Sequence, residues 1–359
     1  MKFSLILICI FLFWLCNNLD AQKGRKVFVV TITIILVLVS GLRHESVGND
    51  TVVYMTGYEN PEQIQVSHDL ESFWDAFTSQ SDSSDKDPGY YLFVTLLSQI
   101  IPSGRAYLFV IAAISMGLLA YFAHKNVSAL KGILFFYVYY ISIFYSYIPN
   151  SAIRQSFALS FILIGYGFFQ KRQVLKFAGM VLLGSFFHMS ALIALIMIPF
   201  FKINKVKVVG FSGFILFGLA LLNVKRFASL FLSGNDLYNA YLLSNYYGAS
   251  GKPIVVIFLF LGLFLISYMG LINDKNIMEN KMFYYGAFFA LIFSSLIWVN
   301  PSLIRLTAYF GPLLGVSVAN SYNKIKFGNG ILIVVILIFL FSALRDLNDY
   351  YFMWDNVAV

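Results

Sequence analysis

The chain has 359 residues, of which 59% are hydrophobic and only 12% are charged. A soluble protein carries about 25% charged residues, so the composition excludes an ordinary soluble domain and predicts an all-α polytopic membrane protein. The formal net charge of +8 comes from Lys and Arg residues dispersed at the ends of apolar segments. This dispersal favours basic cytoplasmic loops over a nucleic-acid-binding patch, so we expect no nucleic acid as a partner.

Apolar stretches long enough, or nearly long enough, to cross a bilayer recur along the chain. A helix that spans the hydrocarbon core needs about 20 residues. The predicted spans are 3–19, 27–42, 106–123, 132–148, 156–169, 208–222, 253–272, 282–299, 306–320 and 331–345. The first resembles a signal peptide, but cleavage after it would leave Leu19 where a small residue is preferred, so we expect a retained helix. Cys9 and Cys16 lie in this segment and predict neither a disulfide framework nor a metal site.

Two apolar stretches fit the bilayer less simply, and the charges of the loops decide between their interpretations. Residues 90–101 are too short to span, so we expect a half-buried helix there. Residues 177–201 carry His188 in their middle, so we expect a re-entrant hairpin with its tip toward the outer face. With these choices the basic loops fall inside, as the positive-inside rule requires. The inner loops then contain only two acids, Asp274 and Glu279.

The predicted fold is one integral-membrane domain over residues 1–345, with about ten to twelve transmembrane helices and the re-entrant hairpin. Both termini are expected outside. The extracytoplasmic parts are a large acidic first loop, a second loop and a C-terminal tail, at 43–105, 223–252 and 346–359.

This topology leaves three arginines and one histidine at the outer face, against the general bias. They are Arg43, Arg154, Arg305 and His188. Each alone has a simpler explanation, because an arginine can extend to the interface and a histidine can be hydrogen-bonded between helices. Together they indicate a site, since ionisable groups at that depth are costly.

The residue types indicate what such a site would bind. The planar fork of arginine matches phosphate oxygens, so the set suits a lipid-linked phosphate or pyrophosphate. A nearby histidine or aspartate would take a proton from a sugar hydroxyl. Arginines would stabilise the charge of the leaving group, so no metal is required.

Five short motifs follow one another along the chain in an order that resembles a known family. They are "GLRHESVGNDTVVY" (41–54), "DPGYYLF" (87–93), "NSAIRQSFALS" (150–160), "FFHMSAL" (186–192) and "RLTAYF" (305–310). Together they resemble the EpsG/Wzy-type bacterial polysaccharide polymerases over residues 40–310. The matching positions are Arg43, Gly48, Asp50, Tyr54, Pro88, Gly89, Arg154, Gln155, His188, Ser190 and Arg305. Two positions depart from the pattern: Asn49 stands where a small hydroxyl is common, and Asp87 where Glu is frequent.

The resemblance implies a membrane glycosyltransferase of the bacterial inner (plasma) membrane that joins repeat units carried on undecaprenyl pyrophosphate. An acceptor sugar hydroxyl would attack the pyrophosphate-linked donor sugar at the outer face. The residues expected to hold the pyrophosphates are Arg43, Arg154 and Arg305. The base would be Asp50 or His188, and Tyr54 and Gln155 would position sugars or the other side chains. The expected partners are the lipid-linked donor and acceptor glycans, the bilayer, a chain-length regulator and a flippase, with no metal or other cofactor.

Two other functions stay open at this point. A transferase of single sugars from a polyprenyl-phosphate donor would use a metal held by acids of the first outer loop, where Asp82, Asp85 and Asp87 form a loose cluster. Their spacing resembles no rigid ligand cage, so we interpret them mainly as a solvated linker. A transporter or flippase for lipid-linked sugars would show inverted repeats, which the sequence lacks. The aromatic run 135–147 would either line a sugar groove or, more simply, pack densely between helices.

Overall fold

The computed structural model describes residues 1–48, 50–60, 87–232, 253–345 and 350–355. Within these residues the chain is α-helical, with no strand beyond an isolated bridge between Arg43 and Phe352. The protein is therefore an all-α polytopic membrane protein, as the composition predicts. The chain divides into two compact units, the first formed by Met1–Leu192 with Ile333–Val359 and the second by Ile193–Leu332. Whether they behave as a single integral-membrane domain stays a prediction.

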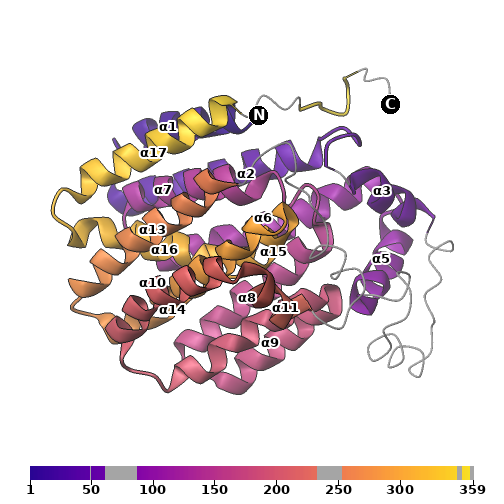
Figure 1. Ribbon diagram of the computed structural model, residues 1–359. Helices are drawn as coiled ribbons and strands as arrows, with labels where there is room; N and C mark the ends of the chain where they lie inside the picture. The colour runs from indigo at the N-terminus through magenta and orange to yellow at the C-terminus, as the bar shows by residue number, and fades with distance from the viewer. Residues whose placement is uncertain (49, 61–86, 233–252, 346–349, 356–359) are drawn as a thin grey trace. The chain divides into compact units, whose positions relative to one another are not determined.

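The first unit is built from most of the N-terminal helices together with the last one (Figure 1). Its helices are α1 (Lys2–Cys16), α2 (Ala21–Gly41), α3 (Thr51–Glu59), α5 (Pro88–Ile100), α6 (Gly104–Asn126), α7 (Leu130–Tyr140), the π-helix η2 (Ile141–Tyr145), α8 (Ile153–Gln170), α9 (Val174–Phe187) and most of α17 (Gly328–Arg345). Within it α2 packs along α6, α8 packs along α9, and the short helices α3 and α5 lie side by side (Figure 1).

The aromatic run 135–147 lies at the centre of this packing. Most of its aromatic side chains, Tyr137, Tyr140 and Tyr145 among them, are almost completely buried. A helix that is apolar on every side is buried on every side, because no face is suited to water. Dense packing is therefore the correct interpretation of this run, and the tyrosines meet neighbouring helices rather than an open groove: the Tyr145 hydroxyl donates to the Leu36 carbonyl oxygen at 2.6 Å.

The loops predicted to lie inside meet one another at one end of the first unit. Arg25 Nη1 donates to the carbonyl oxygens of Val127 and Ser128 at 2.9 and 3.0 Å. At the same end, Gln170 Nε2 donates to Asn126 Oδ1 at 3.0 Å. These contacts agree with the prediction that these loops share one side, while the assignment of that side to the cytoplasm stays a prediction.

The second unit is built around the buried helix α14 (Ile277–Ser294), against which the equally buried α16 (Gly311–Ser321) packs. Its helices are the end of η3 (Met189–Phe201), α10 (Val206–Leu222), α11 (Val224–Leu232), α13 (Ile254–Ile272), α14 (Ile277–Ser294), η4 (Ser295–Trp298), η5 (Pro301–Leu303), α15 (Ile304–Ala308), α16 (Gly311–Ser321) and η6 (Tyr322–Lys324). After its first turn, every residue of α14 from Lys281 to Ser294 is buried, because α10, α13 and α16 all pack against it. A Cβ at Gly286 would lie 2.2 Å from Leu313 Cβ, so a glycine lets α16 approach α14 this closely.

The predicted spans are largely present, with several helices shorter than a bilayer requires. Among the described residues, five helices are long and apolar enough to cross a membrane, or up to seven if each of two bent pairs counts as one span. Shorter apolar helices include α1, α9 and η3. The predicted number of about ten to twelve requires these to cross as well, and it stays a prediction. The segment predicted as outer loop 223–252 begins with α11, and its remainder lies outside the described residues.

The sequence also predicts the two irregular stretches. The helix expected at 90–101 is α5. The long stretch 177–201 is interrupted at His188, whose backbone is extended between the end of α9 and the start of η3. The break is therefore where the loop charges put it, while the reversal of the chain into a hairpin stays a prediction.

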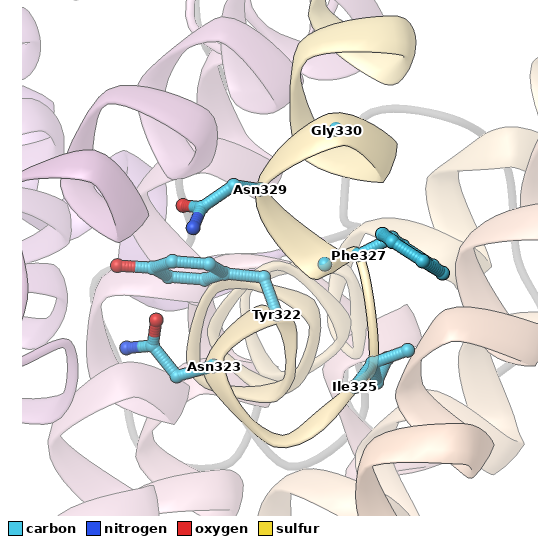
Figure 2. A pocket seen from close by; sticks show the side chains of 7 residues that line it. Tyr322, Asn323, Ile325, Phe327, Asn329 and Gly330 are labelled. Carbon is cyan, nitrogen blue, oxygen red and sulfur yellow. The ribbon is translucent and has the colours of Figure 1, made fainter.

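A buried ion pair closes one end of the second unit. Lys324 Nζ lies 2.9 Å from Asp274 Oδ2, and the same carboxylate accepts hydrogen bonds from Tyr284, Asn280 and the Asn276 backbone. Burial alone would raise the pKa of the Asp274 carboxyl, but these hydrogen bonds together lower it to about 2. A pocket of about 420 Å³ lies on the turn after α16, where the Tyr322 ring sits between the Asn323 and Asn329 side chains (Figure 2). None of the predicted site residues lines this pocket.

Candidate functional site

In the first unit, three helix ends bring polar and charged side chains together. The helix α5 begins at Pro88, α8 begins at Ile153 and α9 ends at Phe187. Proline suits a first helical position, because it has no N–H and its φ is already helical. The preceding residue, Asp87, has a left-handed backbone with φ 67° and ψ 54°, a conformation that aspartate tolerates better than most residues. The chain therefore turns sharply at Asp87 and directs its carboxylate toward the other two breaks.

The carboxylate of Asp87 joins Arg154 and His188. Its Oδ2 atom lies 3.0 Å from Arg154 Nη1 and 3.1 Å from His188 Nδ1. Its Oδ1 atom accepts a hydrogen bond from the Met189 backbone N–H at 3.1 Å. The carboxylate side chain is only 5% exposed, while those of Arg154 and His188 are 28% and 19% exposed. A buried acid therefore orients two partly accessible groups from different helices.

Aromatic side chains hold the other face of Arg154. Its Nε donates to the Tyr54 hydroxyl at 3.2 Å, and its guanidinium carbon lies 5.8 Å from the centre of the Tyr54 ring and 5.9 Å from that of Tyr90. Such contacts stabilise a guanidinium by about 0.5–2 kcal/mol each. We call Asp87, Arg154, His188 and Tyr54 the Asp87 cluster. Its arginine is fixed on one side by an acid and on another by rings.

A second cluster forms where α2 ends. The Arg43 side chain is buried, with its Nη1 donating to the Ser40 carbonyl oxygen at 2.5 Å and to Ser40 Oγ at 3.2 Å. Its Nε donates to Thr51 Oγ1 at 3.4 Å. A cation at the carboxyl end of a helix satisfies free carbonyls and meets the negative end of the helix dipole. Burial lowers the pKa of the Arg43 guanidinium, and no carboxylate among the described residues forms an ion pair with it.

Asn150 connects this arginine to the turn before α8. Ser40 Oγ donates to Asn150 Oδ1 at 2.8 Å, and Thr51 Oγ1 donates to the Asn150 carbonyl oxygen at 3.1 Å. Gly48 approaches the same carbonyl with φ 92°, and a Cβ there would lie 2.1 Å from the oxygen. Only glycine adopts this backbone and this approach without strain. We call Arg43, Ser40, Thr51 and Asn150 the Arg43 cluster.

The C-terminal segment, residues 350–355, covers the end of α2. The His44 backbone N–H donates to the Tyr351 carbonyl oxygen at 2.8 Å, and the Met353 N–H donates to the Leu42 carbonyl oxygen at 2.9 Å. The Tyr350 hydroxyl donates to the Val39 carbonyl oxygen at 2.5 Å. These bonds involve residues just before and just after Arg43. They therefore account for the burial of the Arg43 side chain at a helix end that would otherwise be exposed.

A pair of tyrosines lies between the two clusters. The hydroxyls of Tyr90 and Tyr107 are 2.5 Å apart. The Tyr107 hydroxyl interacts electrostatically with both Arg43 and Arg154. The two arginines therefore belong to one polar region of the first unit, while the assignment of this region to one membrane face stays a prediction.

Comparison with known proteins adds one finding to this geometry. The model of the EpsG family matches residues 26–354. The chain belongs to the EpsG family. No curated protein and no solved structure matches it. The matched residues of the EpsG family include both clusters, Arg305 in the second unit and the C-terminal segment up to Trp354.

The structure brings some of the predicted site residues together and separates others. Arg154, His188 and Tyr54 meet in the Asp87 cluster, and Arg43 lies in its own cluster. Buried Gln155 follows Arg154 in the first turn of α8. Arg305 lies in α15 of the second unit.

The predicted base Asp50 has a less organised setting than His188. It is half-buried and directly precedes α3, where its carbonyl oxygen accepts the Tyr54 N–H at 3.0 Å. Its carboxylate makes no hydrogen bond or ion pair with any residue that the structure describes. The structure thus gives an orienting partner to His188 alone.

The interpretation of Asp87 as part of a solvated linker is wrong. Its carboxylate is buried and contacts two candidate site residues. The sequence signal that would have identified Asp87 is local. An aspartate directly before Pro-Gly at the start of an apolar helix is expected in an ordered turn, unlike an acid inside a Ser-rich run. Asp82 and Asp85 lie outside the described residues. Among those that are described, no group of three or more His, Cys, Asp and Glu lies together as metal ligands would.

Proposed function

We propose that this chain is a membrane glycosyltransferase that polymerises polysaccharide repeat units carried on undecaprenyl pyrophosphate. Membership of the EpsG family supports a polysaccharide polymerase in general. The lipid carrier, the outer face of the bacterial inner membrane, and a chain-length regulator and flippase as partners are parts of the proposal. The observation that carries it is the carboxylate of Asp87 shared between Arg154 and His188.

The shared carboxylate prepares His188 to act as a base. An imidazole whose Nδ1–H donates to a carboxylate keeps its Nε2 lone pair free to accept a proton. The side chain of His188 is partly exposed, so an acceptor hydroxyl has access to it. We therefore assign the base to His188 rather than to Asp50, whose carboxylate has no orienting contact in the described residues.

In the proposed reaction, the acceptor oxygen attacks the anomeric carbon of the donor sugar. The bond from that carbon to the pyrophosphate oxygen breaks, and undecaprenyl pyrophosphate leaves with the electron pair. The acceptor proton passes to His188 Nε2. Because pyrophosphate is a good leaving group, stabilising its charge matters more than protonating it, and fixed cations supply such stabilisation effectively.

Arg154 has the geometry for that role. One Nη atom contacts Asp87 and Nε contacts Tyr54, so the guanidinium is held in place before substrate binds. Its remaining N–H groups and its partial exposure leave it able to meet a phosphate oxygen. Arg43 and Arg305 are proposed to hold further phosphate oxygens of donor and acceptor, and Tyr54 and Gln155 to position the reacting groups.

A complementation experiment tests the proposal. In a strain lacking the native gene, Arg154→Ala and His188→Gln should each leave single repeat units on the surface instead of long chains, at normal protein levels. Arg305→Ala should reduce chain formation as well. The matched control is Arg105→Ala, which removes an arginine from the first turn of α6, outside both clusters. Long chains at normal protein level in Arg154→Ala would refute the phosphate role. Loss of single repeat units as well would indicate a flippase.

A further inference from the structure

Two hydrogen-bond donors in the Arg43 cluster have no acceptor. Arg43 Nη2 and Asn150 Nδ2 are both buried, and neither has a hydrogen-bond partner among the described residues. The side chains that carry them are each about 1% exposed. A buried donor without an acceptor is unfavourable and uncommon in folded proteins, so two of them in one cluster need a reason.

The two donors are linked through one hydroxyl. Arg43 Nη1 donates to Ser40 Oγ, and Ser40 Oγ donates in turn to Asn150 Oδ1. This chain of bonds uses the oxygen of the Asn150 amide and so turns its N–H₂ group toward other partners. Thr51 and Gly48 fix the backbone of Asn150 from the other side. The cluster therefore holds both donors in place without using them.

The charge of the cluster indicates what would accept these bonds. A guanidinium with no carboxylate partner in the described residues carries an unbalanced positive charge in a buried place. A neutral acceptor would satisfy the donors but not the charge, whereas a phosphate oxygen would satisfy both. We propose that Arg43 Nη2 and Asn150 Nδ2 form a binding site for one phosphate group of a diphosphate, closed in this structure by the C-terminal segment. This inference rests on the proposed function, because it takes the diphosphate to be that of the lipid-linked substrate.

The C-terminal segment determines how a ligand reaches the site. Its bonds to the backbone of Leu42 and His44 and to the Val39 carbonyl close the end of α2 on either side of Arg43. A diphosphate can reach the buried Nη2 atom only if this segment moves away. None of these three bonds belongs to the hydrogen bonds within a helix of the first unit.

The test uses the full-length chain purified in detergent, with thermal unfolding followed by a thiol-reactive fluorophore. Cys9 and Cys16 are free and buried, so they react when the protein unfolds. A ligand that binds only the folded protein raises the melting temperature. Inorganic pyrophosphate, undecaprenyl pyrophosphate and phosphatidylglycerol are added in separate arms. We expect stabilisation by both diphosphates and none by phosphatidylglycerol. Equal stabilisation by phosphatidylglycerol would identify a lipid headgroup site and overturn the assignment to substrate.

The decisive variant is Asn150→Asp. It keeps the acceptor oxygen for Ser40 and places a negative charge next to the unbalanced guanidinium. The variant should therefore melt at a higher temperature than the wild type and bind inorganic pyrophosphate about 10- to 100-fold more weakly. A structural asparagine would instead lose stability on this change. Asn126→Asp is the matched control, because the Asn126 Nδ2 already donates to the Phe122 carbonyl oxygen at 2.8 Å. It should melt lower and bind pyrophosphate normally.

Access is tested with Met353→Pro, which removes the N–H that bonds the Leu42 carbonyl. If closure competes with binding, this variant binds inorganic pyrophosphate more tightly than the wild type. Unchanged or weaker binding would overturn the role of the C-terminal segment as a cover. A wild type that no diphosphate stabilises, or an Asn150→Asp variant that responds like the wild type, would overturn the site itself. Those results leave the complementation test of Arg154 and His188 unaffected, so the two proposals fail separately.

Discussion

Replacing the Asp87 carboxylate with an amide removes the acceptor that Arg154 and His188 share. The wild-type carboxylate accepts from three groups at 3.0 to 3.1 Å, and asparagine offers one oxygen and no charge. Its N–H₂ group would face either the guanidinium or the imidazole, both of which are donors in the wild type. The substitution therefore loses the ion pair and the fixed imidazole tautomer together.

The size of the effect follows from burial. Loss of one partner of a fully buried pair costs about 3–5 kcal/mol. The side chain of Arg154 is 28% exposed, so solvent screens part of its charge and we expect a stability loss of only about 1–2 kcal/mol. The rate should suffer more, because the base is then held in the wrong orientation, and we expect a fall of roughly 10²- to 10⁴-fold.

The assay is the initial rate of polymer formation in membrane vesicles supplied with lipid-linked repeat units, at matched protein level. Asp87→Glu keeps the charge and should recover part of the rate, whereas a purely structural loss would follow the melting temperature in both variants. Asp20→Asn is the control, since Asp20 is exposed and makes no side-chain bond at the start of α2. A rate for Asp87→Asn within about twofold of the wild type would refute the assignment of Asp87 as the residue that positions His188.

Three further outcomes are expected. Gly48→Ala should lower the free energy of unfolding by about 1–3 kcal/mol, because its φ is 92° and the added Cβ meets the Asn150 carbonyl. The control is Gly117→Ala, whose added Cβ meets nothing within 4 Å. An unchanged melting temperature for Gly48→Ala would contradict this reasoning. Tyr54→Phe keeps the ring over Arg154 but removes the hydroxyl that accepts from Arg154 Nε, so the polymerisation rate should fall about 3- to 10-fold. A loss of rate as large as that of Arg154→Ala would contradict this, because it would mean that the ring no longer packs against Arg154. The pKa of the Asp274 carboxyl is lower in the folded chain than its ordinary value, so the carboxylate contributes up to about 2 kcal/mol of stability above pH ~4, which is lost as the pH falls toward 2. The melting temperature of Asp274→Asn should therefore depend less on pH, between pH 6 and 3, than that of the wild type. The same pH dependence in both proteins would contradict the assignment.

Composition and loop charge predict much of this fold, because the bilayer imposes strong and simple rules on a chain. The shortage of charged residues identifies the class, and the distribution of Lys and Arg identifies the break at His188 and the short helix α5. The same rules predict that Arg43, Arg154 and His188 share one face. These rules use only the sign and position of charges along the chain, so they locate breaks between helices, while the sidedness that they assign stays a prediction.

The contacts inside the site follow from different physics. Asp87 meets His188 across 101 residues of sequence, and neither local periodicity nor loop charge contains that pairing. An acid beside a Ser- and Asp-rich stretch has the composition of a linker, and only its position before Pro88 distinguishes it. Arg43 has the pattern of a side chain that extends into the interface, but the C-terminal segment buries it. Tertiary pairing thus decides which charged residues near a membrane face are site residues.

The pairing of residues 350–355 with the end of α2 has a consequence for biosynthesis. The partners on either side of Arg43 leave the ribosome early, whereas the C-terminal segment that covers them follows after the whole of the second unit has been made. During translation every helix that the structure describes is therefore already made while the Arg43 cluster is still open. A premature stop codon just after α17 would yield a protein that inserts normally and keeps the Asp87 cluster, yet leaves this end uncovered.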